Sequence, residues 1–186
     1  MIFVSAGHYP QRPGAGYQNF YEHDEAVLWQ RDIMDALFKL SASDPTAFAV
    51  PTGVLKDKVA YINHRSQANS IAIEIHFNAA VDSKGNNVGK GCESLYFPGS
   101  DIGKSIATLL NNTLAIDFAP NRGVKEGWYR MDKAHGADFF LEKTNCPAVI
   151  LEPEFIQFKE RIQTNRRATC ERLAEVLITA TRDLLG

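Results

Sequence analysis

The sequence predicts a single α/β domain over residues 1–186, built on a twisted, mostly parallel or mixed sheet of about five to six strands with helices on both faces. Three observations predict it. The length of 186 residues suits one domain. Short apolar runs rich in Val, Ile and Phe are typical of buried strands. These runs alternate with longer segments of helical period, which supply the crossovers that parallel strands need.

In the first half of the chain, periodicity and breaks at Pro and Gly predict the helices and strands. In order, they predict a strand over 2–5 that closes at Ala6-Gly7-His8, a Pro-, Gly- and Tyr-rich loop over 9–21, a helix over 24–40, a break over 41–45, a strand over 47–50 and a helix over 54–70. A central strand follows over 71–75. Its isoleucines alternate with Ala72 and Glu74, which is the two-residue period of a strand, and His76 follows where it ends.

The second half continues the alternation. In order, the pattern predicts a polar turn region over 81–91, a strand over 93–97, a helix over 101–115 with Asp101 as its N-cap, a loop over 117–139 with a short strand at 123–125, a helical turn over 139–144, a strand over 147–152 and a last helix over 158–185.

Composition excludes several classes of protein. Hydrophobic residues make up 45% of the chain and the net charge is −2, without the basic face that nucleic-acid binding requires. No apolar run approaches a membrane span, so we expect no membrane insertion. Met1 leads directly into a strand, and we expect no secretory signal. The three cysteines are odd in number and widely spaced, which favours reduced thiols but leaves a Cys92–Cys146 pairing open.

Ionisable residues stand at the ends of three predicted strands. His8 follows the first strand, His76 the central one, and Glu152 ends a late one, while Glu22 lies at the junction between the loop and the first helix. Two histidines and a carboxylate are the ligand set of a catalytic zinc with an open fourth position. A further carboxylate beside such a metal can act as general base. The pattern therefore indicates one Zn²⁺ held by His8, Glu22 and His76, with Glu152 as the base.

Each of these residues also has an ordinary structural interpretation. His8 and His76 could be hydrogen-bonded without a metal, and Glu22 could simply favour the positive end of a helix dipole. Glu152 could be half of a buried ion pair with Arg65 or Arg122. Further carboxylates compete for the same roles: Glu25 as an alternative to Glu22, Glu74 as a substitute ligand or a partner of His76, and Glu154 beside Glu152.

Motifs that run in order along the chain carry a family resemblance. They are Ser5-Ala6-Gly7-His8, Gly14-Ala15, Glu22 just before the first long helix, Arg65-Ser66-Gln67-Ala68-Asn69, Ile75-His76-Phe77-Asn78-Ala79, Asn121-Arg122-Gly123-Val124-Lys125 and the run Pro147 to Glu152. Together they resemble the zinc-dependent N-acetylmuramoyl-L-alanine amidases of the amidase-3 type, which include phage endolysins and bacterial cell-wall amidases. Two carboxylates depart from the pattern: Ser is common where Glu74 stands, and Gly where Glu154 stands.

The resemblance implies a function. It implies hydrolysis of the amide between the lactyl group of N-acetylmuramic acid and the L-alanine of peptidoglycan stem peptides. His8, Glu22 and His76 would hold one zinc ion, Glu152 would be catalytic, and Asn78 and Arg122 would bind substrate. Two alternatives remain: a zinc carboxypeptidase-like peptidase, with Arg65 or Arg122 as the carboxylate clamp, and a non-catalytic peptidoglycan-binding module with the same fold.

The expected partner is therefore peptidoglycan, and the expected place of action is the cell wall. A catalytic domain without an export signal fits a phage or prophage lysin made in the cytoplasm, although a truncated exported amidase fits as well. We expect the chain to act as a monomer.

Overall fold

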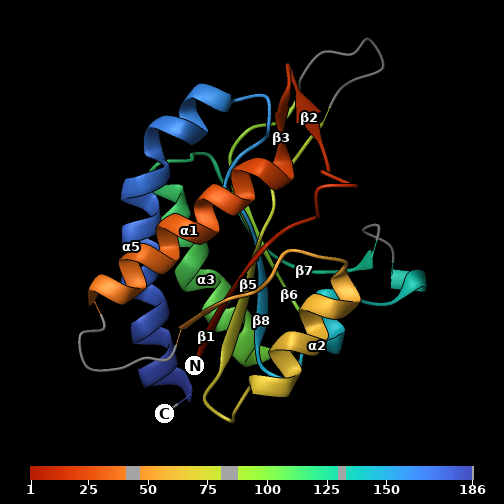
Figure 1. The fold of residues 1–186 in the computed structure, drawn as a ribbon, viewed down its shortest axis with the longest axis vertical. Helices are drawn as coiled ribbons and strands as arrows, with labels where there is room; N and C mark the ends of the chain where they lie inside the picture. Colours follow the sequence, from red (N-terminus) through yellow and green to blue (C-terminus); the bar gives the residue numbers. More distant parts are fainter. Residues whose placement is uncertain (41–46, 81–87, 130–132, 186) are drawn as a thin grey trace.

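The computed structural model describes residues 1–40, 47–80, 88–129 and 133–185, and within them it forms an α/β sheet flanked by helices (Figure 1). The main sheet has six strands in the order β4-β1-β5-β8-β6-β7. Their bounds are β1 Ile2–Ala6, β4 Ala47–Ala49, β5 Ile71–Ile75, β6 Cys92–Tyr96, β7 Asn121–Glu126 and β8 Ala148–Glu152. The predicted fold class is confirmed.

The sheet is mixed, with one reversal. Strands β4, β1, β5 and β8 pair in parallel, and β6 pairs with β7 in parallel. Strand β6 runs antiparallel to β8, which places Glu93 directly opposite Glu152. Because β1, β5 and β8 are parallel neighbours, their carboxyl ends lie at one edge of the sheet.

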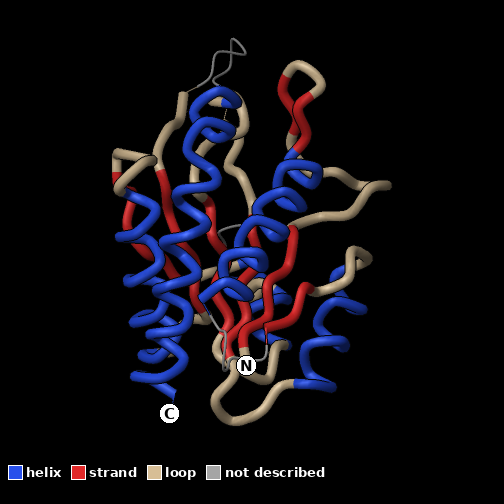
Figure 2. Tube along the Cα trace, turned by 60° about the vertical axis from the view of Figure 1, so that its left-hand side comes forward, coloured by secondary structure: helices blue, strands red, loops and turns tan. Residues whose placement is uncertain are grey.

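Helices cover both faces of the sheet. One face carries α1 Glu22–Leu40, α3 Asp101–Ala115 and α5 Lys159–Leu185. The other carries α2 Leu55–Arg65 and the short α4 Phe139–Lys143. Figure 2 shows the strands lying between the two groups of helices. A 3₁₀ helix, Lys133–His135, precedes α4.

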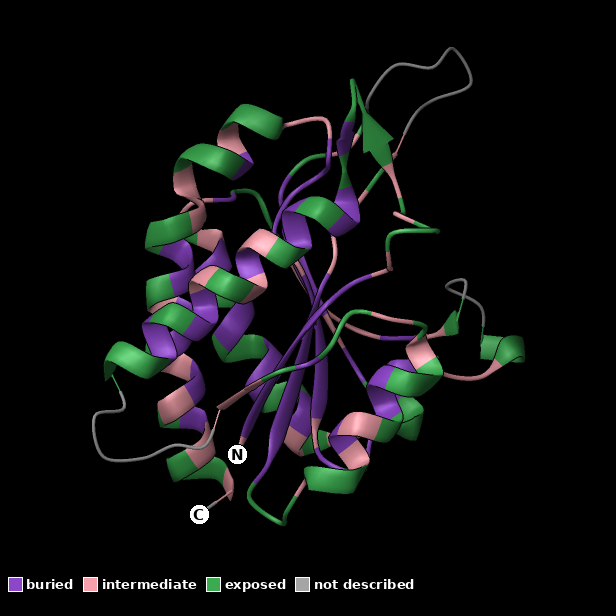
Figure 3. Cartoon of the chain, viewed as in Figure 1, coloured by how far each residue is buried: buried purple, intermediate pink, exposed green. Residues whose placement is uncertain are grey.

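Alternation along the strands builds two separate cores. Ile71, Ile73 and Ile75 of β5 pack with the apolar stripes of α1, α3 and α5. Ala72 points to the opposite face, among the apolar residues of α2 and α4. Figure 3 shows that the strands are buried and that the exposed residues lie on the outer sides of the helices. Glu74 shares the face of Ala72, so its carboxylate lies in the smaller core beside α2.

Several predicted boundaries were wrong. The loop over 9–21 contains a short hairpin, β2 Gly16–Tyr17 and β3 Phe20–Tyr21, which lacks the periodicity that predicts strands. Helix α1 begins at Glu22 rather than at residue 24, and α2 ends at Arg65 because Ser66 is extended. The N-cap of α3 is Ser100, whose hydroxyl accepts from Gly103 N at 3.0 Å, and Asp101 is already the first helical residue.

The remaining expectations concern the cysteines, membrane insertion and two loop segments. All three cysteines are buried free thiols, so the Cys92–Cys146 pairing is absent. Among the described residues, no helix is both long and apolar enough to cross a bilayer. The predicted break at 41–45 and most of the turn region at 81–91 lie outside the described residues.

Candidate active site

The ends of the three central parallel strands bring the predicted site residues together. His8 follows β1, His76 follows β5 directly, and Glu152 is the last residue of β8. The backbone N–H of Gly7 donates to Ile75 O at 2.8 Å, and that of His76 donates to Leu151 O at 2.8 Å. These bonds fix the register of the strand ends, so residues far apart in sequence meet at one edge.

His8, Glu22 and His76 form one cluster. His8 Nε2 lies 3.0 Å from Glu22 Oε2, and His76 Nδ1 lies 2.9 Å from Glu22 Oε1. One potential ligand atom from each residue lies within 4.8 Å of the others. The two imidazole rings lie edge to face, with centroids 4.9 Å apart. The three residues that the sequence predicts as ligands therefore converge.

Glu22 is held rigidly from two sides of the site. It begins α1 and is buried, and its carboxylate accepts from Ala15 N and from Phe77 N, each at 3.0 Å. Burial alone would raise the pKa of this carboxyl, but the hydrogen bonds and charges of His76 and His8 outweigh it and hold the pKa far below its ordinary value. Glu22 is therefore an anion in place to receive a cation.

Two glycines leave room for the cluster. A Cβ on Gly7 would lie 2.7 Å from His76 Cε1, and one on Gly14 would lie 2.4 Å from Glu22 Oε2 and 2.5 Å from His8 Cδ2. Gly14 also has a φ of 77°, which strains any residue with a Cβ. The Gly-rich segments after β1 therefore let the backbone approach the ligand side chains closely.

This close approach gives a testable prediction. Gly14→Ala should displace Glu22 or His8 and weaken the zinc binding that the sequence predicts for this cluster by about tenfold or more. The matched control is Gly99→Ala, because Gly99 has a similar φ of 79° but nothing within 4 Å of its Cβ position. Chelator competition measures both affinities. Equal zinc affinity in the two variants would contradict the prediction.

Glu152 lies beside the cluster without joining it. The residue is half-buried, and its Oε2 is shielded from solvent with no hydrogen-bond partner in the described part of the chain. Burial, together with the negative charges of Glu22 and Glu93, raises its pKa to about 8 against the opposing charges of His76 and Arg122. A carboxylate that carries a free oxygen and a raised pKa is suited to accept and release a proton near neutral pH.

The two predicted substrate-binding residues meet on one carboxylate. Asn78 Nδ2 donates to Glu93 Oε1 at 2.8 Å, and Arg122 Nη2 lies 3.1 Å from the same oxygen. The Arg122 guanidinium also stacks over the Phe155 ring, and its buried Nη1 has no partner among the described residues. Glu93, to which no sequence motif pointed, therefore aligns both side chains next to Glu152.

The competing carboxylates have other partners. Glu25 is buried against Arg166, with Oε1 2.9 Å from Nη1, and lies outside the cluster. Glu154 follows the end of β8, accepts from Phe155 N and pairs with Arg161 at 2.6 Å. Both carboxylates anchor neighbouring helices.

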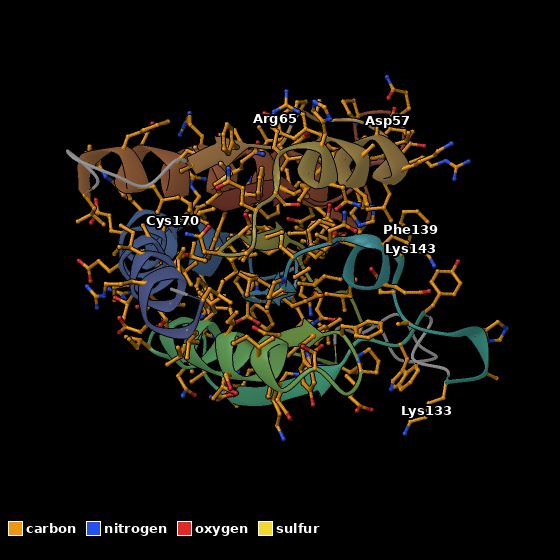
Figure 4. The ribbon with its side chains drawn as sticks, turned by 90° about the horizontal axis from the view of Figure 1, so that it is seen from below. Asp57, Arg65, Lys133, Phe139, Lys143 and Cys170 are labelled. Carbon is orange, nitrogen blue, oxygen red and sulfur yellow. The ribbon has the colours of Figure 1, made fainter. Side chains whose placement is uncertain are left out.

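Neither arginine pairs with Glu152 among the described residues. Arg122 pairs with Glu93, and Arg65 stacks on Tyr61 at 3.9 Å. Figure 4 places Arg65 at the end of α2 opposite Asp57. The Asp57 end of α2 carries Lys58, which contacts the site, so Arg65 lies at the helix end away from it.

Supporting residues below the site were not predicted from the sequence. His23 Nδ1 lies 2.8 Å from Gly7 O, and its Nε2 lies 3.2 Å from the Thr52 hydroxyl. Lys58 is buried with its ammonium between strand ends. A signal existed for Lys58, because it shares the inward stripe of its helix with Val59 and Ile62.

A cavity of ≈ 240 Å³ opens on the cluster. It is lined by His8, Tyr9, Gly53, Leu55, Lys58, Glu74, His76 and Asp138. A larger cavity of ≈ 490 Å³ lies between α1 and α5, but its lining is an exposed mixture of charges without converging ligand groups. The chemistry of the side chains therefore favours the smaller cavity as the site.

The donor set fits a divalent metal. Two imidazole nitrogens and a carboxylate converge, two glycines clear the space around them, and both histidines line the cavity. The fold and the site together define a class: α/β proteins that can hold a metal at the carboxyl edge of the central strands.

The chain belongs to the N-acetylmuramoyl-L-alanine amidase family of the amidase-3 type, whose family model matches residues 2–180. Solved structures share the fold. An N-acetylmuramoyl-L-alanine amidase from Clostridium difficile 630 is 21% identical with a TM-score of 0.70, over 96% of this chain and 92% of that one. The catalytic domain of an endolysin targeting Clostridia difficile is 21% identical with a TM-score of 0.68, over 97% and 95%.

A third structure is similar over nearly its whole length. The catalytic domain of CwlV, an N-acetylmuramoyl-L-alanine amidase from Bacillus (Paenibacillus) polymyxa var. colistinus, is 18% identical with a TM-score of 0.73, over 99% of this chain and 97% of that one. At these identities the likeness shows the fold. A search of curated protein sequences finds no match.

Proposed function

We propose that the chain is a zinc-dependent amidase that hydrolyses the bond between the lactyl group of N-acetylmuramic acid and the L-alanine of peptidoglycan stem peptides. The observation that carries the proposal is the convergence of His8, Glu22 and His76 beside Glu152, in a chain of this family. The same membership supports peptidoglycan as the substrate and the cell wall as the place of action.

The proposed ligands are His8 Nε2, His76 Nδ1 and the Glu22 carboxylate, the atoms that face one another in the cluster. Zinc bound there would supply a Lewis acid for the scissile carbonyl and would acidify a water molecule. The backbone N–H groups of Ala15 and Phe77 keep the Glu22 carboxylate in its place.

Glu152 moves the proton in this proposal. The half-buried Glu152 carboxylate accepts a proton from the attacking water and then delivers it to the leaving amine of L-alanine. A leaving amine must be protonated to depart, and Glu152 returns to it the proton taken from the water.

Asn78 and Arg122 are the proposed substrate contacts. Glu93 fixes both side chains, and the Arg122 side chain is 28% exposed, so its guanidinium is accessible as a donor for a substrate oxygen. A guanidinium with an unused donor matches the carbonyl and carboxylate groups of a stem peptide.

Digestion of intact peptidoglycan tests the function. We expect new amino termini on L-alanine and no change in reducing sugars, and we expect activity to disappear with a chelator and return with Zn²⁺. The measurement is amino-terminal labelling followed by mass spectrometry of the released peptides.

Each alternative predicts a different product. Release of terminal D-alanine would favour the carboxypeptidase-like peptidase, which needs an arginine clamp. Binding to peptidoglycan without any cleavage by zinc-loaded protein would favour the non-catalytic module. Full activity in a metal-free sample would contradict the zinc mechanism.

A further inference from the structure

A buried ion pair lies directly beneath the candidate metal cluster. Lys58 of α2 and Glu74 of β5 are each 3% exposed, and Lys58 Nζ lies 3.1 Å from Glu74 Oε1. Val59, Ile62 and Ala72 belong to the apolar core on this face of the sheet, and the Ser5 hydroxyl donates to Glu74 Oε1 at 2.9 Å. Two buried charges cost desolvation energy, and replacing a buried ion pair by apolar side chains of similar volume is often neutral or stabilising. The requirements of the fold alone therefore do not explain the pair.

Glu74 contacts a proposed metal ligand. Its Oε2 lies 3.1 Å from His76 Nε2, while His76 Nδ1 faces Glu22 Oε1 at 2.9 Å. An imidazole that binds a metal through one nitrogen keeps its proton on the other. With Glu74 as the acceptor at Nε2, the lone pair of Nδ1 is directed into the cluster with His8 and Glu22.

Lys58 also contacts the backbone of His8, the other histidine of the cluster. Its ammonium donates to His8 O at 2.8 Å and also to Ala6 O, the carbonyls at the end of β1. His8 has a φ of 56°, a left-handed conformation that is strained for a residue with a Cβ. The bond from Lys58 holds this backbone in place, so one ammonium supports His8 and, through Glu74, His76.

Charge balance agrees with this role. The pair of Lys58 and Glu74 is neutral in sum. Glu74 can therefore accept from His76 without leaving an uncompensated buried charge beside the metal.

We infer that Glu74, held by Lys58, is a positioning residue that orients His76 for metal binding through Nδ1. The inference rests on the proposed function, because it assumes that the cluster binds zinc. It gives the two buried residues a common role, which is to fix the direction of the proposed ligand nitrogen before the metal arrives.

Two double variants isolate the hydrogen bond from the charge pair. Lys58→Met with Glu74→Leu replaces the pair by apolar side chains and removes the acceptor. Lys58→Met with Glu74→Gln also removes both charges but keeps an amide oxygen to accept from His76 Nε2. We expect the leucine variant to bind zinc about 10- to 100-fold more weakly than wild type, and the glutamine variant to bind it more tightly than the leucine variant. The loss that both variants share reflects the missing bonds from Lys58 to Ala6 O and His8 O. Competition with a chromogenic chelator measures the affinities on samples whose folding is verified by thermal melting.

Nitrogen-15 NMR of the zinc-loaded wild type gives a second readout. We expect His76 to be metal-bound at Nδ1, with a protected Nε2–H proton that persists in the glutamine variant and exchanges away in the leucine variant.

Glu154→Gln is the control for the affinity measurements, because it removes another buried charge, 2.6 Å from Arg161, without touching a proposed ligand. Its zinc affinity should equal that of wild type.

The outcomes separate the two proposals. Failure of wild type to bind zinc would contradict the proposed function itself. Zinc affinity within about twofold of wild type in a folded leucine variant would overturn only the role of Glu74. Metal bonding of His76 through Nε2 in wild type would also overturn it, whether or not any variant folds.

Discussion

Glu152→Gln is expected to lower kcat by about 10²- to 10⁴-fold while zinc binding stays unchanged. Glutamine keeps the size of the side chain but has no site that takes up and releases a proton. Glu152 is absent from the ligand cluster, so its replacement should spare the metal. Kinetics on purified muropeptides and zinc affinity, measured on the same sample, check the two halves of the prediction.

The same variant should be more stable than wild type in alkaline solution when both are zinc-free. Burial raises the pKa of Glu152 from 4.5 to about 8 in the folded protein. The folded state therefore holds this proton more tightly than the unfolded state, and wild type loses stability as pH rises from about 5 through 8. Glu152→Gln avoids that loss, so the melting temperatures should agree at about pH 5 and diverge at about pH 9. Variant and wild type melting alike at both pH values would show that burial does not perturb Glu152.

The strand ends were predictable because short-range patterns determine them. The alternating segment 71–75 is followed by His76, the apolar run 2–5 is followed by His8 after two small residues, and the run 147–152 ends on Glu152. Parallel pairing then makes these ends neighbours, which the structure confirms through the adjacency of β1, β5 and β8. Neither step requires knowledge of long-range contacts beyond the rule that parallel strands present their carboxyl ends together.

The supporting contacts were not predictable in the same way. Lys58 shares the inward side of α2 with Val59 and Ile62, which indicates burial, but only the three-dimensional packing shows that its ammonium reaches Glu74 and His8 O. Glu93 opposes Glu152 because β6 reverses direction, and no local pattern reports a reversal. The β2–β3 hairpin has two residues in each strand, too few for a period to appear.

Glu22→Gln is expected to weaken zinc binding by at least about a hundredfold and to abolish activity, because it removes the anion shared by both histidines. The matched control is Glu25→Gln on the same turn of α1. Glu25 is equally buried but pairs with Arg166, so its replacement should cost about 1–3 kcal/mol of stability and leave zinc affinity unchanged. Titration with Zn²⁺ and urea unfolding of both variants make the comparison.

The pair of variants separates a ligand from a structural carboxylate, which the sequence alone left open. The hydrogen bonds and charges of His76 and His8 depress the pKa of Glu22 against the effect of burial, so its anion stabilises the zinc-free fold above its unfolded pKa and that stability is lost as pH falls. Glu22→Gln should therefore also be less stable than wild type at neutral pH, which alone would not identify a ligand. Loss of zinc binding in Glu25→Gln, or its retention in folded Glu22→Gln, would assign the metal to the other carboxylate. The geometry favours Glu22 as the ligand, because the bonds from Ala15 N and Phe77 N hold its oxygens between the two imidazoles.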